Sequence, residues 1–305
     1  MDQINEVTII GAGPAGIAAA IYLQRAELNP ILMEKNEPGG LLRHAYLVEN
    51  YPSFPEGISG CTLAEQFVKQ LHMVGASITK SGVKHVHHHD DKFHIETDQG
   101  CLVSSTIIIS TGTIPKKLEI PGSTSIEGTR LFYEPQSILL KENGVKKRIL
   151  VIGGGDIAFD YTLTLLNWRH EVTIISRSKL TCLSLLQERV IKNGAVIHTI
   201  CVPEEIVEHS EDILFRCRRN EHIEEIPFDF IVVACGRVPN ISFLSSTLKK
   251  CFDTASDFPK TSLPGLYFAG DVIRGTHRQT GIAVGDGIHA AMMAEHYLRK
   301  RPVKP

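Results

Sequence analysis

One pattern constrains the fold of this chain more than any other feature of its sequence, and it occurs twice. An apolar strand, EVTII, precedes the glycine-rich turn GAGPAG, the helical run IAAAIYLQRAE and a second strand, PILMEK. Further along, RILVI precedes GGGDIA, FDYTLTLLNW and EVTIIS. A strand, a glycine-rich turn and a helix leading to another strand form the β-α-β unit that binds dinucleotides. The sequence therefore predicts an α/β chain with two Rossmann-like, three-layer ββα dinucleotide-binding domains.

The first turn, residues 11–16, carries glycines at the three positions that dinucleotide binding requires. Gly11 permits the tight turn, Gly13 lets the backbone approach a pyrophosphate, and Gly16 allows the helix to pack closely on the strand. The helix N-terminus offers unpaired N–H groups to the phosphates. Glu34 ends the next strand, where a carboxylate accepts hydrogen bonds from ribose hydroxyls. We expect this site to comprise Gly11, Gly13, Pro14, Ala15, Gly16 and Glu34.

A segment much later in the chain, GLYFAGDV, is expected to complete the first site. Asp271 follows an apolar strand and Gly270, so its carboxylate is placed to accept hydrogen bonds from the ribityl chain of a flavin. The alternative is an aspartate that only caps the following helix. Because GAGPAG is present as well, we favour the flavin interpretation, in which Gly270 and Asp271 bind FAD.

The second turn, residues 153–158, ends in alanine, which the dinucleotide pattern allows. The strand that follows its helix ends in SRSK, and no acidic residue stands where NAD-binding units hold the ribose. Arg177 and Lys179 would pair instead with a 2′-phosphate, which favours NADP. We expect the NAD(P)H site to comprise Gly153, Gly155, Asp156, Ile157, Arg177 and Lys179.

Composition excludes several classes of partner. The formal net charge is −2 and the isoelectric point is about 6.7, so no basic field indicates binding to nucleic acid or anionic lipid. No apolar run approaches the roughly 18 residues of a membrane span. The sequence enters its first strand directly, so no signal peptide is expected. We therefore expect a cytoplasmic protein with neither a nucleic-acid partner nor a membrane.

The seven cysteines are scattered singly, and none has C-x-x-C spacing. This pattern is typical of free thiols in a reducing cytosol and argues against a structural zinc site. Cys235 ends an apolar strand and is interpreted as a small buried residue. Cys182 follows two basic residues, which would lower the pKa of an exposed thiol. The histidines of KHVHHHDDKFHIET lie in a predicted hairpin, on alternating faces, so no metal site is expected.

Several motifs occur in the order found in one enzyme family: GAGPAG with Glu34, STG at 110–112, GGGDIA, GRVPN at 236–240, FAGDV, and RQT at 278–280. In this the chain resembles the low-molecular-weight thioredoxin reductases over nearly its whole length. The resemblance implies a discontinuous FAD-binding domain, residues 1–114 plus 243–305, with an NAD(P)H-binding domain inserted at 115–242. It also implies linkers that permit rotation between the domains, and a homodimer.

The same resemblance implies further cofactor contacts. The segments GGL at 39–41 and ENYP at 49–52 are similar to those beside the flavin in the family. A helix that begins near Thr280 would direct its N–H groups at the flavin's pyrimidine edge. The FAD site is thus expected to include Gly40, Leu41, Asn50, Thr111, Gly112, Gln279 and Thr280.

The chain departs from the family in two places. At the second turn only Arg177 matches the family's His-Arg-Arg run, and Ile157 stands where a small hydroxyl residue is usual, so the alternative is a retained fold that binds nucleotide poorly. The family's C-x-x-C also lies just before the second turn, where this chain has LFYEPQSI at 131–138. Tyr133 and Glu134 occupy that neighbourhood, and two-cysteine exchange there is excluded.

These observations favour an FAD-dependent NAD(P)H oxidoreductase that passes electrons to an external acceptor. The flavin itself carries the redox chemistry, and no side chain is assigned a catalytic role. A ferredoxin or flavodoxin is the leading acceptor, and oxygen, a quinone or a dye-like molecule are further candidates. Two alternatives stay open: a flavin-binding partner or sensor with a vestigial nucleotide domain, and a disulfide reductase that uses another donor and a partner's thiol.

Overall fold

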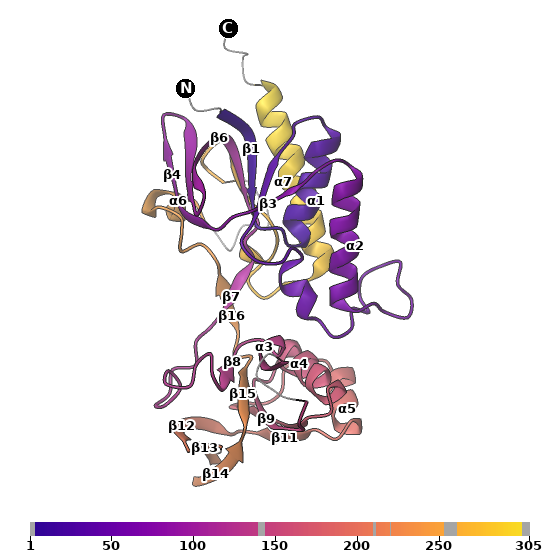
Figure 1. Cartoon of the computed structure of the whole chain (residues 1–305), viewed down its shortest axis with the longest axis vertical. Helices are drawn as coiled ribbons and strands as arrows, with labels where there is room; N and C mark the ends of the chain where they lie inside the picture. Colours follow the sequence, from indigo (N-terminus) through magenta and orange to yellow (C-terminus); the bar gives the residue numbers. More distant parts are fainter. Residues whose placement is uncertain (1–3, 140–143, 210–211, 220, 253–260, 301–305) are drawn as a thin grey trace. The chain divides into compact units, whose positions relative to one another are not determined.

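The computed structural model describes residues 4–139, 144–209, 212–219, 221–252 and 261–300. The chain divides into two compact units (Figure 1). Unit 1 consists of Met1–Arg43, Val48–Ile114 and Val238–Pro305, and unit 2 of His44–Leu47 and Pro115–Arg237. Most of unit 2 is thus one insertion into the sequence of unit 1. The assignment of FAD and NAD(P)H to these two parts of the chain stays a prediction.

Unit 1 is built on a sheet in the order β3-β2-β1-β6-β5-β4, with β17 paired to β6. The pairs β1–β2, β1–β6, β2–β3 and β6–β17 are parallel, and β4–β5 and β5–β6 are antiparallel. The last four residues of β1 are buried, because a central parallel strand is covered on both faces. The strands are β1 (Ile4–Ile10), β2 (Ile31–Glu34), β3 (Ile78–Lys80), β4 (Val83–His89), β5 (Lys92–Thr97), β6 (Gly100–Ile109) and β17 (Leu266–Phe268).

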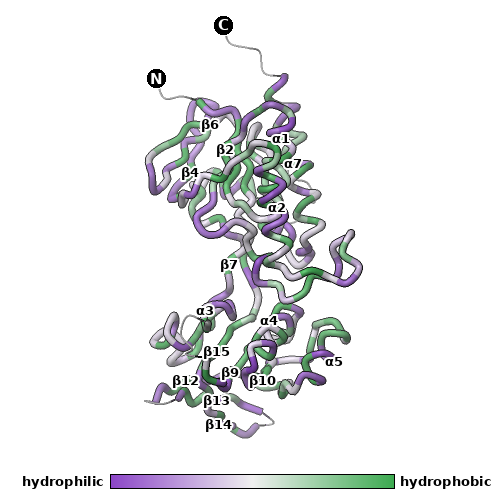
Figure 2. The backbone as a smooth tube through the Cα atoms, turned by 45° about the vertical axis from the view of Figure 1, so that its right-hand side comes forward, coloured by the Kyte–Doolittle hydropathy of each residue, from purple (hydrophilic) through white to green (hydrophobic). Residues whose placement is uncertain are grey.

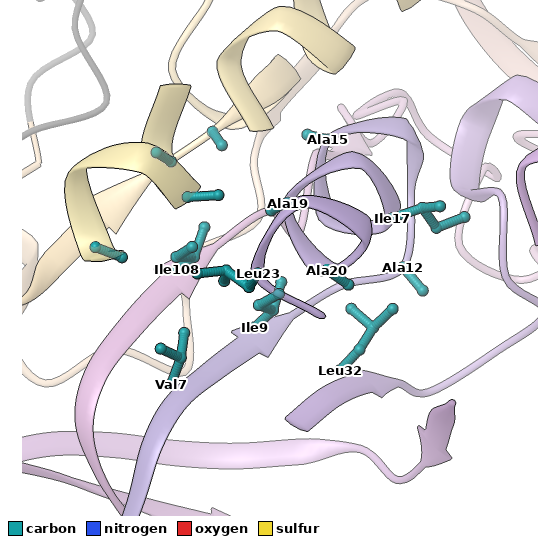
Figure 3. Packing of buried hydrophobic residues seen from close by; sticks show 14 of the residues in the cluster. Val7, Ile9, Ala12, Ala15, Ile17, Ala19, Ala20, Leu23, Leu32 and Ile108 are labelled. Atoms are coloured by element: carbon teal, nitrogen blue, oxygen red, sulfur yellow. The ribbon is translucent and has the colours of Figure 1, made fainter. Parts of the chain in front are cut away.

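Two helices from opposite ends of the chain pack together on this sheet. In Figure 3, Ala15 and Ala19 of α1 lie between that helix and the yellow helix α7, while Leu23 and Ile108 lie nearer the strands. Small side chains at this contact let the two helix backbones approach closely. The helices of unit 1 are α1 (Pro14–Arg25), η1 (Gly40–His44), α2 (Gly60–Met73), α6 (Ser246–Lys250), η2 (Gly270–Val272) and α7 (Thr280–Lys300).

The predicted histidine hairpin is formed by β4 and β5. Its turn residues, Asp90 and Asp91, have φ of +50° and +56°, a left-handed conformation that aspartate tolerates. His87 lies opposite His94 in the register, and their rings stack with centroids 5.0 Å apart. Within the described residues, no three His, Cys, Asp or Glu side chains gather as a metal site would require.

Unit 2 contains a parallel sheet in the order β11-β10-β9-β15-β8, beside an antiparallel sheet β12-β13-β14. Hydrophobic residues run along β9 and β15 (Figure 2), as expected for strands buried on both faces. The strands are β8 (Leu131–Phe132), β9 (Arg148–Ile152), β10 (Glu171–Ser176), β11 (Val196–Thr199), β12 (Val202–Glu208), β13 (Ile213–Arg219), β14 (His222–Phe228) and β15 (Phe230–Val233).

The helices of unit 2 follow the predicted β-α-β order, with α3 (Gln136–Leu139), α4 (Asp156–Asn167) and α5 (Ser184–Lys192). Two short strands, β7 (Thr113–Pro115) and β16 (Arg237–Pro239), pair where the chain passes from one unit to the other. The predicted fold class, an α/β chain with two Rossmann-like sheets, is confirmed. None of the described helices combines the length and apolar character of a membrane span.

Candidate active site

The first glycine turn has the backbone geometry that its sequence predicts. Gly11 has φ of +101°, and a Cβ atom there would lie 2.5 Å from the Ser110 carbonyl oxygen. At Gly16 a Cβ would lie 1.8 Å from the Gly11 carbonyl oxygen. Gly13 differs, because, apart from its chain neighbours, no heavy atom of the described residues lies within 4 Å of the place its Cβ would take. Two of the glycines are therefore required by packing, whereas the third leaves open space that fits a pyrophosphate.

The groups around this space also fit an anion. Helix α1 begins at Pro14, and no side chain caps its N-terminus, so its first N–H groups are available to phosphates. Glu34 lies at the carboxyl end of β2 and accepts hydrogen bonds from the Ala12 and Asn36 N–H groups, each at 2.8 Å. A carboxylate has further acceptor sites, so Glu34 can brace the turn and also accept from a ribose hydroxyl.

The Gly270–Asp271 segment lies directly against the first turn. Gly270 has φ of +79°, and a Cβ there would come within 2.9 Å of the Ala15 Cβ atom. This contact joins two motifs that are about 255 positions apart in the sequence. The segment forms the short helix η2, with Asp271 half-buried.

Other residues of the predicted FAD site are also brought together within unit 1. A Cβ at Gly40 would lie 3.4 Å from the Cα of Gly13, and the Asn50 side-chain amide donates to Gln279 Oε1 at 2.7 Å. The Thr111 hydroxyl donates to the Asn240 carbonyl oxygen at 2.6 Å. Gly112, with φ of +61°, has no atom within 4 Å of a Cβ position, Leu41 lies in η1, and Thr280 begins α7.

The second glycine turn repeats this arrangement in unit 2. A Cβ at Gly153 would lie 2.6 Å from the Ala234 carbonyl oxygen, so this position requires glycine. At Gly155 the nearest atom is Thr181 Oγ1, at 3.7 Å, and no side chain caps the N-terminus of α4. This turn therefore also leaves room, and unpaired amides, for a phosphate.

Asp156 and Ile157 both have structural contacts that the sequence motif does not reveal. One oxygen of the Asp156 carboxylate accepts a hydrogen bond from the Leu183 N–H group, at the start of α5, at 2.9 Å. Ile157 is partly buried and packs against the hydrophobic core of unit 2. Both side chains thus help to hold the fold around the turn.

The two basic residues after β10 are exposed, and neither forms an ion pair with a described residue. The segment that carries Arg177 and Lys179 folds back onto the turn, because the Thr181 and Cys182 N–H groups donate to the Gly154 carbonyl oxygen at 2.8 and 3.2 Å. Two cations without an acidic partner beside an open glycine turn fit the 2′-phosphate of NADPH.

An ion pair and two tyrosines lie in or beside the segment 131–138, where the family resemblance leads us to expect a dithiol. Glu134 Oε1 lies 3.7 Å from Arg237 Nη1, and the Arg237 side chain is only 8% exposed. Tyr133 accepts a hydrogen bond from the Leu118 N–H group at 3.2 Å. Burial raises the pKa of Tyr161 far above its usual range, and its hydroxyl finds no hydrogen-bond partner among the described residues. Tyr133, Tyr161 and Arg237 line a cavity of about 10 Å³, room for one water molecule.

A family model described as pyridine nucleotide-disulphide oxidoreductase matches residues 5–287. The chain belongs to this family. It is 34% identical to the thioredoxin reductase of Rickettsia conorii, over 98% of this chain and 100% of that protein. It is 30% identical to a Clostridium pasteurianum protein named "34.2 kDa protein in rubredoxin operon", over 96% and 97% of the two chains. The crystal structure of Lactococcus lactis thioredoxin reductase superposes with a TM-score of 0.87 at 31% identity, over 97% and 100%.

This pyridine nucleotide-disulphide oxidoreductase is accordingly an FAD-dependent NAD(P)H oxidoreductase, similar to thioredoxin reductases, with FAD and NADPH or NADH as its cofactors. The glycine turns of both units fit these dinucleotides, because each turn leaves open space beside a helix N-terminus that its N-cap residue does not cap. The resemblance inferred from the motifs is thereby confirmed.

The interpretation of Cys235 as a small buried residue was wrong, and the exposure that an activated Cys182 would need is not found. Cys182 is buried, and burial raises the pKa of its thiol, so the neighbouring basic residues do not activate it. Cys235 is an exposed residue. Its sulfur is nevertheless partly desolvated, which raises the pKa of the thiol, and the thiol donates to the Ile152 carbonyl oxygen at 3.4 Å. Burial depends on what packs over a residue from elsewhere in the chain, and a local sequence pattern does not contain that information.

One thiol pair is created by the tertiary structure alone. The Cys201 and Cys217 thiols interact with each other, and this interaction, together with burial, raises the pKa of the Cys217 thiol. Both residues are buried in the core around β13. A buried pair is out of reach of a protein disulfide, so it does not replace the exchange dithiol of the family.

Proposed function

We propose that this enzyme passes electrons between NADPH or NADH and a small electron-carrier protein without using a dithiol of its own. The observation that carries the proposal is the segment 131–138, where the family resemblance places two cysteines and the chain has none. Disulfide exchange needs one thiolate to attack and a second thiol to resolve the mixed disulfide. A chain without this pair must release electrons to an acceptor that reaches the flavin itself.

In this proposal the first site, in unit 1, holds FAD. The open space at Gly13 and the uncapped start of α1 receive the pyrophosphate, while Glu34 accepts from a ribose. Asp271 accepts from the ribityl chain, and the N-terminus of α7 at Thr280 stabilises negative charge on the ring. When bound, FAD accepts hydride from the reduced nicotinamide and releases electrons onward.

The second site, in unit 2, holds the nicotinamide dinucleotide. Gly153 and Gly155 shape the turn that receives its pyrophosphate, and Arg177 with Lys179 pairs with the 2′-phosphate, so NADPH is the preferred donor. Asp156 and Ile157 support this site through the contacts that hold the turn.

A carrier of the ferredoxin or flavodoxin type is the acceptor that we favour. The clostridial relative supports this class, because its name associates it with rubredoxin. The family resemblance further supports a homodimer that acts in the cytoplasm.

The first test is anaerobic stopped-flow reduction of the purified flavoprotein by NADPH and, separately, by NADH, followed at the flavin absorption band. We expect both nucleotides to bleach the flavin rapidly. At low nucleotide concentration, NADPH should bleach it faster than NADH. If neither nucleotide bleaches a flavin that dithionite reduces, unit 2 is a vestigial nucleotide domain, and a binding role or another donor replaces this proposal.

The second test measures the acceptor. The NADPH-reduced enzyme is mixed anaerobically with oxidised ferredoxin, flavodoxin, rubredoxin or thioredoxin disulfide, and flavin reoxidation is recorded. We expect reoxidation by at least one of the three carriers and none by thioredoxin disulfide. Reoxidation by the disulfide, with none by the carriers, would overturn the carrier assignment.

A further inference from the structure

Unit 1 contains a buried ion pair that no dinucleotide motif includes. Asp286 lies in the second turn of α7, and its side chain is only 5% exposed. Its partner Arg274, with a side chain 18% exposed, follows η2. Arg274 engages both carboxylate oxygens of Asp286 through Nε, at 2.8 Å, and through an Nη group. The pair is therefore bidentate and largely withdrawn from solvent.

The same carboxylate also holds the turn that precedes Asp271. Asp286 Oδ2 accepts a hydrogen bond from the Gly270 N–H group at 3.2 Å. Gly270 is buried, so loss of this acceptor would leave its N–H group without a partner away from water. One side chain thus connects α7 to both ends of the Gly270–Arg274 segment.

The position of Asp286 along α7 is itself fixed by the first glycine turn. A Cβ at the adjacent Gly287 would lie 2.0 Å from the Ala15 carbonyl oxygen, so α7 and α1 meet backbone to backbone at this point. A Cβ at Gly270 would lie 2.9 Å from the Ala15 Cβ atom. Asp286 therefore directly precedes the residue at which α7 meets Ala15 of the GAGPAG turn, and it is hydrogen-bonded to the Gly270 turn. Figure 3 shows Ala15 beside α7.

Stability alone does not account for such a pair. A buried ion pair often contributes no more than well-packed apolar residues of similar volume, because desolvation offsets the attraction between the charges. An apolar pair, however, would leave the Gly270 N–H group without an acceptor. What the carboxylate adds is a fixed position for the turn.

We propose that Asp286, held by Arg274, is a positioning residue for the flavin: it fixes the Gly270–Asp271 turn relative to the GAGPAG turn. This inference rests on the proposed assignment of Asp271 to FAD. Its consequence is that the hydrogen-bond acceptor at position 286, and not the charge, determines FAD affinity.

Two double variants separate the acceptor from the charge. Arg274→Met with Asp286→Asn removes both charges but keeps an oxygen for the Gly270 N–H group. Arg274→Met with Asp286→Leu removes the charges and the acceptor. We expect the leucine variant to bind FAD about tenfold or more weakly than the asparagine variant, which should stay within about threefold of the wild type.

The measurements are the dissociation constant for FAD, from titration of the apoprotein, and the visible absorption spectrum of the flavin at saturation. Thermal melting of each apoprotein separates a loss of folding from a loss of affinity. Arg299→Ala removes the exposed arginine of the Arg299–Glu295 pair on the same helix; it is the matched control and should change neither quantity. If the leucine variant does not fold, Arg274→Met with Asp286→Ala removes the same acceptor and takes its place.

Asp271→Ala tests the underlying assignment in the same titration. The inference is supported if Asp271→Ala and the leucine double variant bind FAD weakly while the asparagine double variant does not. Equal affinity of both double variants, with weak binding by Asp271→Ala, overturns the inference and leaves the proposed site standing. Unchanged affinity of Asp271→Ala removes the proposed site and this inference together.

Discussion

At the scale of single residues, glycines that look equivalent in the motif have different physical roles. Gly16 is required because a Cβ would collide with the Gly11 carbonyl oxygen, whereas Gly13 faces open space. The motif alone assigns both to nucleotide binding. The structure separates the glycine that packing requires from the glycine that a ligand requires.

This difference predicts opposite outcomes for two alanine substitutions. Gly13→Ala should leave the free energy of unfolding of the apoprotein within about 0.5 kcal/mol of the wild type and weaken FAD binding about tenfold or more, since its Cβ enters the ligand's space. Gly16→Ala should lower the free energy of unfolding by several kcal/mol, on the order of other overpacking substitutions. Urea unfolding of both apoproteins, with FAD titration of Gly13→Ala, measures these effects. Equal destabilisation by both would contradict the assignment.

A second prediction at this scale concerns Asp160 of α4. Burial raises the pKa of its carboxyl to about 6, although the carboxylate accepts hydrogen bonds from the Tyr46 N–H group of the same unit at 3.0 and 3.1 Å. Because the folded-state pKa of an acid is raised, its stabilising contribution is complete below pH 4 and is lost as the pH rises through 6. The loss amounts to about 3 kcal/mol at most.

Asp160→Asn removes this titration. Between pH 4 and pH 7, the free energy of unfolding of the wild type should therefore fall relative to that of the variant. Urea unfolding across this range measures the difference, and Asp98→Asn, at an exposed carboxylate, is the control. A constant difference between wild type and Asp160→Asn would exclude the titration.

At the scale of elements, the loop after β10 is the part of the chain that we propose sets the nucleotide preference of the second site. The loop is held against the glycine turn by the hydrogen bonds of Thr181 and Cys182 to Gly154, and by Asp156 at the start of α5. These contacts keep Arg177 and Lys179 beside the turn. Of the two, only Arg177 matches the His-Arg-Arg run expected from the family resemblance.

Substitution of Arg177 and Lys179 by alanine should therefore weaken the binding of NADPH more than the binding of NADH. Loss of two charge-assisted contacts to the 2′-phosphate should raise the apparent dissociation constant for NADPH about tenfold or more and change that for NADH little. Flavin reduction by stopped flow over a range of nucleotide concentrations measures both. Lys192→Ala, on the exposed face of α5, serves as the control. An equal rise for NADPH and NADH would show that these residues do not contact the 2′-phosphate.

At the scale of the whole molecule, the chain keeps the fold of thioredoxin reductases without their dithiol. The proposed route of electrons through the flavin alone makes every thiol dispensable. This includes the exposed Cys235, whose pKa burial raises and the charge of Arg177 lowers.

Alkylation therefore provides a test. The Cys235→Ala variant, reduced with NADPH and treated with N-ethylmaleimide, should keep its rate of carrier reduction within about twofold, because disulfide exchange is not part of its turnover. A thioredoxin reductase with an intact dithiol, treated in the same way, should lose its thioredoxin reduction. Loss of carrier reduction in the variant would mean that another thiol takes part.

Local sequence was sufficient to predict the elements and the glycine turns. A strand, a glycine that must adopt positive φ and an amphipathic helix follow from neighbours in the chain, so GAGPAG and GGGDIA predict their own backbone geometry. The absence of a C-x-x-C pair is likewise a property of the sequence. These local features were enough to predict the fold class and the two candidate dinucleotide sites.

Which side chains support those sites depends instead on packing between distant segments. Residues from separate elements meet in the contact of Asp286 with Arg274 and Gly270 and in the hydrogen bond from the Leu183 N–H group to Asp156. The burial of Cys182 likewise depends on other elements. No periodicity encodes such contacts, because burial and pairing depend on packing between segments that are distant in the chain. The motifs determined where dinucleotides fit, and the packing between elements determined what holds those motifs in place.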